Sequence, residues 1–418
     1  MRPTRAPWER VSVAEVCESI VDCVNKTAPT VDEPTPYKMI RTTNVKKGWV
    51  NLSEVKFVTK ETFDRWTRRQ LPRKGDVILT REAPLGEVGM LRGDDQVFLG
   101  QRLVSYRANP AKLDNRFLLY AFQGRDVQAQ VKGLGSGATV EHMRVPDCEK
   151  LTLSLPPLSE QRRIASILSA YDDLIENSTR RIAILEEMAR RIYEEWFVRF
   201  RFPGHDQVQK VASELGLIPE GWRVGSLGEA AAINARSIRP ADAPLEILYI
   251  DIASVVPGAI TQKQPYRFSE APGRARRVVG HGDVIWSCVR PNRRSYALIL
   301  QPEPALIAST GFAVLSAKSV PYSYLYFAVT TDDFVGFLTN HATGAAYPAV
   351  TASTFEAAPF LIPEEEVADQ FHAVVAPMLD LSETLKRKNA NLRATRDLLL
   401  PKLISGELDV STLSEPTV

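Results

Sequence analysis

Arginine and asparagine are concentrated in one short stretch of the chain, CVRPNRRS at residues 288–295. Arg, Asn, Gln and Lys side chains can form paired hydrogen bonds with the edges of DNA bases, and Arg and Lys also neutralise phosphates. The stretch follows DVIWS, an alternating run that predicts a strand ending at Ser287. We therefore single out these side chains as candidates for contact with a nucleic acid, with a solvated surface charge as the ordinary alternative for each.

The predicted strand belongs to a sequence that the chain contains twice. Gly-Asp-Val-Ile begins at Gly75 and again at Gly282, 207 residues later. Five further matches keep the same order at offsets between 206 and 214 residues, and they begin at Trp8 and Trp222, Tyr37 and Ile247, Phe117 and Ser323, Gly135 and Ala342, and Leu155 and Ile362. Six ordered matches indicate an internal duplication, so equivalent loops of the two copies should serve the same purpose.

The other candidate residues lie beside the repeated strands, where equivalent loops are expected to face the same ligand. In the first copy the candidates for DNA contact are Arg41, Thr43, Asn44, Lys46, Lys47, Arg68, Arg69, Arg81, Gln101, Arg102 and Ser136. In the second copy they are Ser254, Arg276, Arg277, Arg290, Asn292, Arg293, Arg294, Ser309, Thr310 and Thr343. The denser clusters DRWTRRQLPRK and GRARR suit phosphates better than bases.

Ser136 belongs to the glycine-rich stretch GLGSGAT at residues 133–139. The stretch is not followed by Lys-Ser or Lys-Thr, and it does not lead from a strand into a helix as a P-loop does. A flexible surface loop and a backbone contact with a DNA phosphate both remain open interpretations.

The chain is organised as two repeated units, each followed by a long helix. Residues 1–157 and 219–363 contain short alternating runs separated by Gly, Pro and Asn, which predicts mixed α+β units. Residues 158–201 contain neither Gly nor Pro and carry apolar residues at steps of three and four, which predicts one long helix. Residues 364–404 predict a second helix, which Pro377 should kink or split.

Residues 202–218 are the expected linker between the first helix and the second unit, and residues 405–418 form a tail. An amphipathic helix of this length cannot bury its own apolar face, so the two helices should pair. An antiparallel pair would relate the two α+β units by a pseudo-two-fold axis. Such a molecule suits double-stranded DNA, which has two-fold axes of its own, and it also suits a scaffold that binds proteins at both ends.

Charge and composition limit the classes of protein. Residues 1–157 hold 25 Lys and Arg against 19 Asp and Glu, although the whole chain has a net charge of only +2. The local excess favours an anionic partner, with ordinary variation as the alternative. No apolar run reaches the ~18 residues of a membrane span, and the N-terminus lacks a signal-peptide core, so we expect a cytoplasmic protein without a membrane partner.

The sequence also lacks the catalytic motifs that we sought. No G-x-x-x-x-G-K-[ST], H-E-x-x-H or G-x-S-x-G motif is present. An adenine methyltransferase would need Asn/Asp-Pro-Pro-aromatic to hold a flipped base, but Pro156-Pro157 is followed by Leu-Ser. The four cysteines form no C-x-x-C pair and the five histidines are isolated, so we expect free thiols, no metal site, no bound cofactor and no catalysis by this chain.

Several segments resemble the specificity subunits of type I restriction-modification systems. Residues 155–200, which begin LPPLSEQRR, are similar to their central region, and LRATRDLLLPKLISGEL at 392–408 is similar to their C-terminal region. WERVSVAEV and IPEGWRVGSLGE resemble the starts of their target-recognition domains. The resemblance covers nearly the whole chain. The acidic PEEEVADQF departs from the PPLSEQ pattern after the second unit, which leaves open a different docking of the second helix.

The resemblance implies a DNA-binding subunit that does no catalysis itself. Each target-recognition domain would read one half of a split DNA sequence, and the helices would set the spacer between the halves. Two modification subunits would carry S-adenosylmethionine and methylate adenine N6, and restriction subunits would cleave unmethylated DNA. The alternative is a two-ended protein scaffold, or a decayed subunit, without sequence-specific DNA binding.

Overall fold

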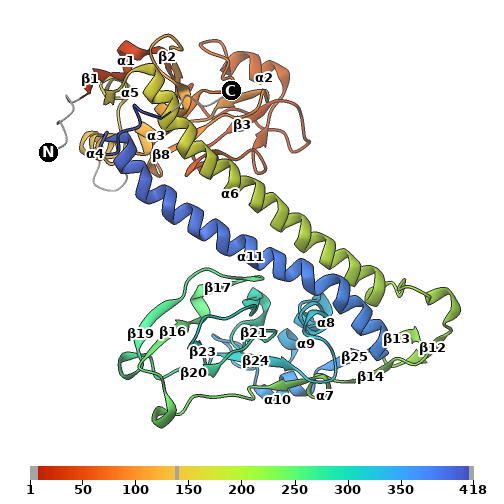
Figure 1. The fold of residues 1–418 in the computed structure, drawn as a ribbon. Helices are drawn as coiled ribbons and strands as arrows, with labels where there is room; N and C mark the ends of the chain where they lie inside the picture. The colour runs from red at the N-terminus through yellow and green to blue at the C-terminus, as the bar shows by residue number, and fades with distance from the viewer. Residues whose placement is uncertain (1–7, 137–140, 414–418) are drawn as a thin grey trace. The chain divides into compact units, whose positions relative to one another are not determined.

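The computed structural model describes residues 8–136 and 141–413, and the chain divides into two compact units (Figure 1). Unit 1 contains Met1–Asn177 and Asn389–Val418, and unit 2 contains Ser178–Lys388. The chain contains two long helices, α6 (Leu158–Tyr193) and α11 (Glu365–Ile404). Each helix has one part in unit 1 and the other part in unit 2. Within the described residues, no helix is long and apolar enough to cross a membrane.

The body of unit 1 is a six-stranded sheet in the order β2-β10-β7-β8-β5-β4 and a three-stranded sheet in the order β6-β3-β9. β1 and β11 pair antiparallel and bring the two ends of the α+β domain together. The strands are β1 (Glu9–Ser12), β2 (Cys17–Asp22), β3 (Lys38–Ile40), β4 (Val45–Lys46), β5 (Gly48–Val50), β6 (Lys56–Phe57), β7 (Val77–Arg81), β8 (Leu85–Met90), β9 (Val97–Leu99), β10 (Leu103–Ala108) and β11 (Thr152–Leu155). The helices are α1 (Val13–Val16), η1 (Thr42–Asn44), α2 (Lys60–Trp66), α3 (Asn115–Gln123), α4 (Arg125–Leu134) and α5 (Val145–Cys148).

The body of unit 2 is a pair of four-stranded sheets in the orders β15-β24-β21-β22 and β19-β16-β23-β20. β14 and β25 pair as β1 and β11 do in unit 1. The strands are β14 (Arg223–Ser226), β15 (Ala231–Ile233), β16 (Glu246–Ile250), β17 (Val255–Val256), β18 (Ala259–Ile260), β19 (Gln264–Arg267), β20 (Ala275–Val278), β21 (Val284–Ser287), β22 (Tyr296–Leu298), β23 (Leu306–Ser309), β24 (Phe312–Ala317) and β25 (Pro359–Ile362). The helices are α7 (Leu227–Ala230), η4 (Pro240–Asp242), η5 (Ile252–Ser254), η6 (Phe268–Glu270), η7 (Pro291–Arg293), α8 (Tyr322–Ala328), α9 (Asp332–Asn340) and α10 (Ala352–Glu356).

The segment between α6 and β14, which the sequence predicted as a linker, contains local structure. A short π-helical turn, η2 (Glu194–Val198), follows α6, and the 3-10 turn η3 (His205–Gln207) comes next. β12 (Lys210–Ser213) and β13 (Gly216–Pro219) then form an antiparallel hairpin. Gly216 has a φ of +98°, a backbone conformation that suits glycine in such a tight turn.

The two α+β domains repeat the same order of elements, which confirms the internal duplication. The neighbours β2-β10-β7-β8 in unit 1 correspond to β15-β24-β21-β22 in unit 2, and β6-β3-β9 corresponds to β19-β16-β23. Hydrogen bonds repeat at residue level, because the N–H of Gly75 donates to Leu91 O at 2.8 Å and the N–H of Gly282 donates to Ile299 O at 2.8 Å. The predicted α+β class therefore holds for each unit.

The repeated Gly-Asp-Val-Ile is a structural turn that leads into a buried strand. Gly75 and Gly282 have φ values of +91° and +84°, which glycine adopts without strain. Asp76 and Asp283 are buried, and each accepts a backbone N–H three residues upstream, at 3.0 Å and 2.7 Å. Arg107 and Arg236 neutralise these two carboxylates, at 2.7 Å and 2.8 Å. The repeat is retained in the sequence because both strands must start from this turn.

Each unit has its own apolar core. In unit 1 the core joins the six-stranded sheet to α3 and to parts of both long helices, and it includes Phe117, Leu168 and Leu403. In unit 2 the fully buried Trp286 on β21 donates its Nε1–H to Val329 O at 2.9 Å. Each of these two cores contains residues of a sheet together with residues of both long helices. The core therefore attaches each α+β domain to its own part of the helix pair.

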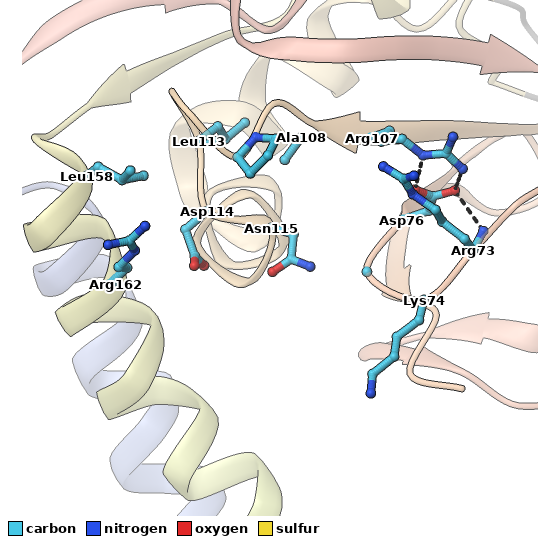
Figure 2. Close-up of a pocket in the computed structure, with 12 residues that line it drawn as sticks. Arg73, Lys74, Asp76, Arg107, Ala108, Leu113, Asp114, Asn115, Leu158 and Arg162 are labelled. Atoms are coloured by element: carbon cyan, nitrogen blue, oxygen red, sulfur yellow. Dashed lines mark hydrogen bonds and ion pairs between the residues drawn. The ribbon is translucent and has the colours of Figure 1, made fainter. Parts of the chain in front are cut away.

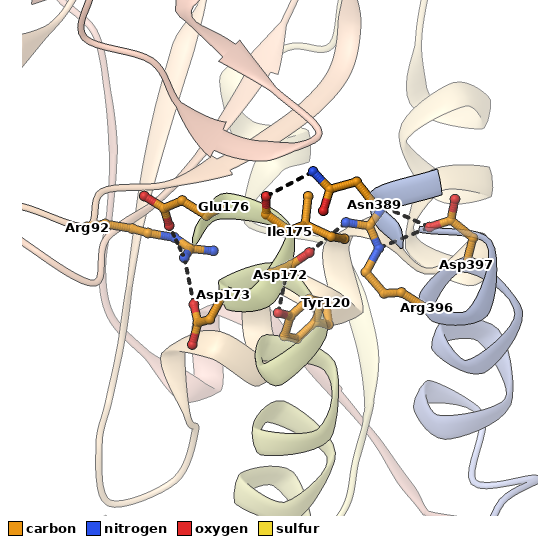
Figure 3. Close-up of polar contacts among 9 residues, drawn as sticks. All are labelled: Arg92, Tyr120, Asp172, Asp173, Ile175, Glu176, Asn389, Arg396 and Asp397. Carbon is orange, nitrogen blue, oxygen red and sulfur yellow. Dashed lines mark hydrogen bonds and ion pairs between the residues drawn. The ribbon is translucent and has the colours of Figure 1, made fainter. Parts of the chain in front are cut away.

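The long helices run antiparallel within each unit, as the sequence predicted. In unit 1, Asn389 Nδ2 donates to Ile175 O at 3.4 Å and Arg396 Nη1 donates to Asp172 Oδ1 at 2.6 Å (Figure 3). Residue numbers therefore rise along α6 as they fall along α11. In unit 2, Glu186 of α6 accepts hydrogen bonds from Ser382 and Lys386 of α11, at 3.1 Å and 2.6 Å.

Of the two effects expected of Pro377, a kink or a split of the second helix, the split does not occur. α11 continues through it without interruption. Pro377 and Ala373, whose carbonyl loses its intrahelical donor, are both exposed, so water can satisfy that carbonyl. The proline lies on the solvent side of the helix, where the missing hydrogen bond costs least.

A buried ionic contact attaches unit 1 to both helices and leads to a stability prediction. Asp172 is 4% exposed, and it accepts hydrogen bonds from Arg396 and from the Tyr120 hydroxyl, the latter at 2.7 Å. Burial raises the pKa of Tyr120, which keeps its hydroxyl a donor at neutral pH. Arg396→Leu should destabilise the fold by about 3–5 kcal/mol because it leaves a buried carboxylate without its cation. Urea unfolding measures this loss.

The matched control is Arg393→Leu, a substitution of an exposed arginine on the same helix. It should change the free energy of unfolding by no more than about 0.5 kcal/mol. The double variant Asp172→Leu/Arg396→Leu should recover much of the loss, because it removes the unpaired charge as well. Equal effects of Arg396→Leu and Arg393→Leu would contradict the role of the ionic contact.

Candidate nucleic-acid interface

Three loops of unit 2 meet where β21 ends. The N–H of Cys288 donates to Gly311 O at 2.8 Å, and the N–H of Val350 donates to Cys288 O at 2.9 Å. These backbone bonds hold together the segments 288–295, 309–311 and 343–349. Most candidate residues of the second copy lie on these segments, so the structure brings them to one edge of the sheet.

Arg290 is held in a defined position at this edge. Its φ is 51°, its N–H donates to Pro348 O at 2.7 Å, and its Nη2 donates to Ala346 O at 3.0 Å. The guanidinium carbon lies 4.6 Å from the centre of the Tyr347 ring, and Tyr347 is 69% exposed. The side chain is therefore ordered before any ligand arrives, with polar N–H groups near the surface.

The other candidates on these loops are more accessible. Asn292, Arg293, Thr310 and Thr343 are exposed, and Arg294 forms an ion pair with the exposed Asp332. The N–H of Thr310 donates to Arg274 O at 2.8 Å, which fixes the 309–311 turn beside β20. The edge thus presents several arginines and short polar side chains, the residue types that contact bases and phosphates.

Unit 1 builds the same edge from equivalent backbone contacts. The N–H of Met143 donates to Arg81 O at 2.9 Å, and the N–H of Arg81 donates to Arg102 O at 2.8 Å. Ser136 bridges to His142 just as Thr343 bridges to Ala349 in unit 2. Residues 137–139 of the glycine-rich stretch lie outside the described residues. The predicted equivalence of the two sets of loops is confirmed for the part that is described.

The side chains at the unit 1 edge are more neutralised than those in unit 2. Arg102 forms an ion pair with Glu82 at 3.3 Å, and Arg81 donates its Nη1–H to Met143 O at 2.9 Å. Gln101 and Ser136 are exposed. The basic excess of residues 1–157 therefore does not gather at this edge, whereas the arginines of unit 2 do gather at theirs.

Three candidate readers are buried, which corrects their assignment. Asn44 and Ser254 are 4% and 6% exposed, and each is the last residue of one of two equivalent 3-10 turns. Asn44 accepts the N–H of Arg41 at 2.9 Å, and the Ser254 hydroxyl donates to Asp251 at 2.8 Å. Ser309 is 2% exposed and accepts the N–H of Gly311 at 3.1 Å. Their polar atoms stabilise turns and cannot reach a base edge.

The remaining candidates of unit 1 lie around this edge or beyond it. The Thr42 hydroxyl donates to Ala83 O at 2.9 Å, which places η1, with the exposed Thr43, against the loop after β7. Arg69 pairs with Asp22 at 2.6 Å, at the end of β2. Lys46, Lys47 and Arg68 are exposed, and Arg41 donates to Glu54 O at 3.0 Å.

The cluster DRWTRRQLPRK is divided by the fold rather than gathered. Its last two cations, Arg73 and Lys74, line a small cavity of about 240 Å³ at the start of β7, the opposite end of that strand from Arg81 (Figure 2). Arg107 lies in the same cavity with the buried Asp76. These cations are therefore separated from the loop edge and lie outside the candidate interface.

Arg276 and Arg277 lie on β20 and are only half-exposed. The Arg276 guanidinium carbon lies 5.1 Å from the centre of the Phe268 ring, and its Nη1 donates to Ala275 O at 2.8 Å. Arg277 bridges to Ser237 through the backbone. Both side chains are partly used by the domain itself, so Arg274, exposed at the start of the strand, is the better phosphate candidate of GRARR.

Sequence reasoning missed two residues at these edges. Tyr347 lies within the repeated match that begins at Ala342, and its exposed ring beside Arg290 offers an aromatic contact. Glu82 follows a predicted strand and neutralises the charge of Arg102 by forming an ion pair with it. Their positions in the repeat were a usable signal for both.

The His, Cys, Asp and Glu side chains of the described residues are the ones that could ligate a metal ion. No group of three or more His, Cys, Asp and Glu side chains could hold a metal ion in residues 8–136 and 141–413. All four cysteines are free. Burial raises the pKa of Cys17 to about 12 and of Cys148 and Cys288 to about 11, so these three remain protonated at neutral pH.

Comparison with known proteins gives consistent relatives. A family model described as type I restriction modification DNA specificity domain matches residues 6–187. The type I restriction enzyme MjaIX specificity subunit of Methanocaldococcus jannaschii is 23% identical over 371 residues, covering 85% of this chain and 82% of that protein. The MjaVIII specificity subunit is 21% identical over 346 residues, covering 76% and 77%. A crystal structure of a type I S subunit from M. genitalium shares the fold, with a TM-score of 0.64 at 15% identity over 96% of this chain and 97% of that one.

Proposed function

Because this chain belongs to the specificity subunits of type I restriction-modification systems, we propose that it reads a DNA target made of two separate halves. Residues 1–157 form the first recognition module and residues 219–363 the second, and each reads one half. The chain catalyses nothing and acts by placing other subunits on the sequence that it binds.

One observation carries this proposal. The two modules bring the same three loops to the same end of equivalent strands, yet the side chains on those loops differ. Arg81 of the first module corresponds to Cys288 of the second, and the RPNRRS run has no counterpart in the first. Two modules that recognise two different DNA sequences require the same backbone arrangement with different side chains at the DNA.

The partners follow from the family and are part of the proposal. Two modification subunits bind S-adenosylmethionine and methylate adenine N6 in the target, and restriction subunits cleave DNA that lacks the methyl groups. These reactions act on cellular DNA, which places the complex in the cytoplasm. This chain holds no cofactor itself.

Methylation sequencing of host DNA tests the proposal, with the gene present and with the gene deleted. Loss of adenine methylation at one split, asymmetric motif upon deletion is the expected result. Unchanged methylation, together with no sequence preference of the purified chain plus modification subunit, would instead favour a protein scaffold without sequence-specific DNA binding.

The loop after β21 allows the base-reading and phosphate-contacting arginines to be separated. Arg290 is fixed by two backbone carbonyls, so Arg290→Ala should relax one base position of the half read by the second module, at a cost of about 1–3 kcal/mol in discrimination. Arg293 is exposed, so Arg293→Ala should weaken binding to all sequences and lower its salt dependence. Binding isotherms at several salt concentrations measure both effects.

Arg223→Ala is the matched control for these two substitutions. Arg223 starts β14, where the module begins, and pairs with Glu229 at 2.6 Å. This variant should leave both sequence preference and salt dependence unchanged. If Arg290→Ala and Arg293→Ala behaved like the control, the loop after β21 would not contact DNA.

A further inference from the structure

In unit 1, two side chains fill the space between the sheet and α6. The Arg92 guanidinium carbon lies 3.5 Å from the centre of the Trp49 ring. Arg92 Nη1 also donates to Asp173 and Glu176 of α6, at 3.1 Å and 3.4 Å (Figure 3). Only a cleft of about 450 Å³ remains beside Trp49. The space between the sheet and α6 of unit 1 is therefore largely filled by an arginine that stacks on an aromatic ring and forms hydrogen bonds with helix carboxylates.

The duplication identifies the equivalent positions in unit 2. Trp49 pairs with Lys46 in the β4–β5 hairpin, and Ala259 pairs with Val256 in the β17–β18 hairpin. Ala259 therefore stands where unit 1 has its tryptophan.

The arginine and its carboxylate are located in the same way. Arg92 follows Leu91, which accepts the N–H of Gly75, and Leu300 follows Ile299, which accepts the N–H of Gly282. Leu300 therefore stands where unit 1 has Arg92. The offset of 207 residues between the starts of α6 and α11 aligns Glu176 with Glu383. The helix carboxylate is retained in unit 2, where Arg387 of the same helix pairs with Glu383 at 2.9 Å, while Arg92 and Trp49 are not retained.

Unit 2 consequently has a larger cleft at this place, of about 1020 Å³. Its apolar walls include Tyr193, Tyr296, Tyr326 and Phe327. Six carboxylates and three basic side chains line it, and the three cations are paired as Lys386–Glu186, Arg190–Glu187 and Arg294–Asp332. Arg191 and Arg387, which lie outside the lining, pair with Glu187 and Glu383, so the carboxylates of the lining that form no ion pair with a described residue are Glu194 and Asp333. The cleft is therefore aromatic, with Glu194 and Asp333 as its available negative charges.

This chemistry excludes a DNA phosphate and favours a cation on a flat apolar body. We propose that the cleft of unit 2 binds an arginine side chain, accompanied by an aromatic residue, from a modification subunit. Unit 1 supplies the same pair of side chains from its own sequence, as Arg92 and Trp49. The inference rests on the proposed function, because it takes the modification subunit as the occupant.

The proposal makes the two places for modification subunits unequal. A subunit seated against unit 2 inserts its side chains into the open cleft, whereas the equivalent place in unit 1 is already filled. The first modification subunit should therefore bind at unit 2 and be held more tightly than the second. Stepwise assembly of the complex follows from the difference between Trp49 and Ala259.

Filling the cleft with the residues of unit 1 tests this inference. Ala259→Trp/Leu300→Arg introduces into unit 2 the pair of side chains that unit 1 holds at these positions. Native mass spectrometry of the full chain, titrated with separately purified modification subunit, measures the two binding steps. We expect the tighter step to weaken at least tenfold in the double variant and the weaker step to remain unchanged.

Two further variants keep the test informative. Leu245→Trp adds the same ring to an exposed position of unit 2, where Leu245 is 86% exposed, and should bind like the unmodified chain. Glu194→Gln/Asp333→Asn removes two charges from the cleft without filling it, and should weaken the tighter step several-fold and reduce its salt dependence. This pair of substitutions replaces the filled variant if that variant does not fold.

The outcomes separate this inference from the proposed function. Unchanged binding by the filled and the neutralised variants, with two subunits still bound, would overturn the inference alone. An unmodified chain that binds no modification subunit would overturn the proposed function and the inference together. Self-association of the unmodified chain that Ala259→Trp/Leu300→Arg abolishes would assign the cleft to a second copy of this chain and contradict the inference.

Discussion

Exchange of residues 219–363 for those of a related specificity subunit should replace one half of the DNA target and leave the other half intact. The native motif should lose its methylation completely, and a hybrid motif should gain it. The physical reason is that the module closes on itself. β14 and β25 pair antiparallel, with Arg223 opposite Ile362, so both ends of the exchanged segment lie side by side.

The exchange must preserve the contacts between the module and the helices. Phe371 of α11 packs against Phe327 of the module, with ring centres 6.3 Å apart, and Arg387 donates to Leu300 O at 3.1 Å. A donor module with an aromatic residue at the position of Phe327 should therefore fold on this helix pair. Methylation sequencing of host DNA that carries the chimera reads both halves of the motif at once.

The control is an exchange of the β12–β13 hairpin, residues 210–219, which lies outside the sheets of the module. It should leave the whole motif unchanged. A chimera of the second module that alters both halves, or neither, would contradict independent reading by the two modules.

The duplication was the strongest signal in the sequence, because it can be recognised even though many individual residues differ between the two copies. Gly75 and Gly282 recur since both turns need a positive φ, and Asp76 and Asp283 recur since each buried carboxylate caps that turn. Backbone geometry of this kind restricts residue type strongly. The α+β class and the equivalence of the loops could therefore be predicted from six short matches, whereas the order of the strands in the sheets came only from the structure.

The faces of the long helices could not be predicted to the same accuracy. Leu174, Met188, Val374 and Leu381 belong to the three- and four-residue apolar steps that predict a buried face for each helix, yet they are 48%, 45%, 43% and 38% exposed. Small and polar residues occupy much of the buried face instead, namely Asp172, Ser178, Ala189, Ser382 and Asn389. A pattern that counts apolar residues misses a face that is closed by hydrogen bonds and by side chains of the α+β domains.

The candidate site shows the same limit at the level of single side chains. The loops of the two copies are equivalent because they follow repeated strands. Whether a polar residue on a loop faces outward depends on its local hydrogen bonds. Asn44 and Ser254 form their hydrogen bonds within 3-10 turns. Such capping competes with ligand contact for the same residue types, so composition cannot separate the two roles.

Four residues added to both long helices should lengthen the spacer of the DNA target and preserve both half-sites. The insertions belong between Asn177 and Ser178 in α6 and between Lys388 and Asn389 in α11, where the chain passes from one unit to the other. They fall between the paired contacts of unit 1, which include Asp172 and Arg396, and those of unit 2. Neither set of contacts is interrupted.

The size of the change follows from helix geometry. Four residues extend each helix by about 6 Å and turn it by about 40° beyond a full turn. DNA rises about 3.4 Å per base pair, so the spacer should grow by one to two base pairs, the smaller value applying where the helices are inclined to the DNA axis. Methylation sequencing measures the length of the spacer directly. An unchanged spacer would contradict the role of the helices in setting the distance between the half-sites.

Insertion into α6 alone provides the sharper control. The helices would then be out of register, so either the Asp172–Arg396 contact of unit 1 or the Glu186–Lys386 contact of unit 2 would have to break. The buried pair of unit 1 is the costlier to lose, because Asp172 is 4% exposed whereas Lys386 and Glu186 are 41% and 47% exposed. The single insertion should therefore disrupt unit 2 first, and methylation should be lost rather than shifted to a new spacer. Restored methylation in the double insertion, at a longer spacer, would show that the helices must stay in register for both half-sites to be read and that their common length determines the distance between them.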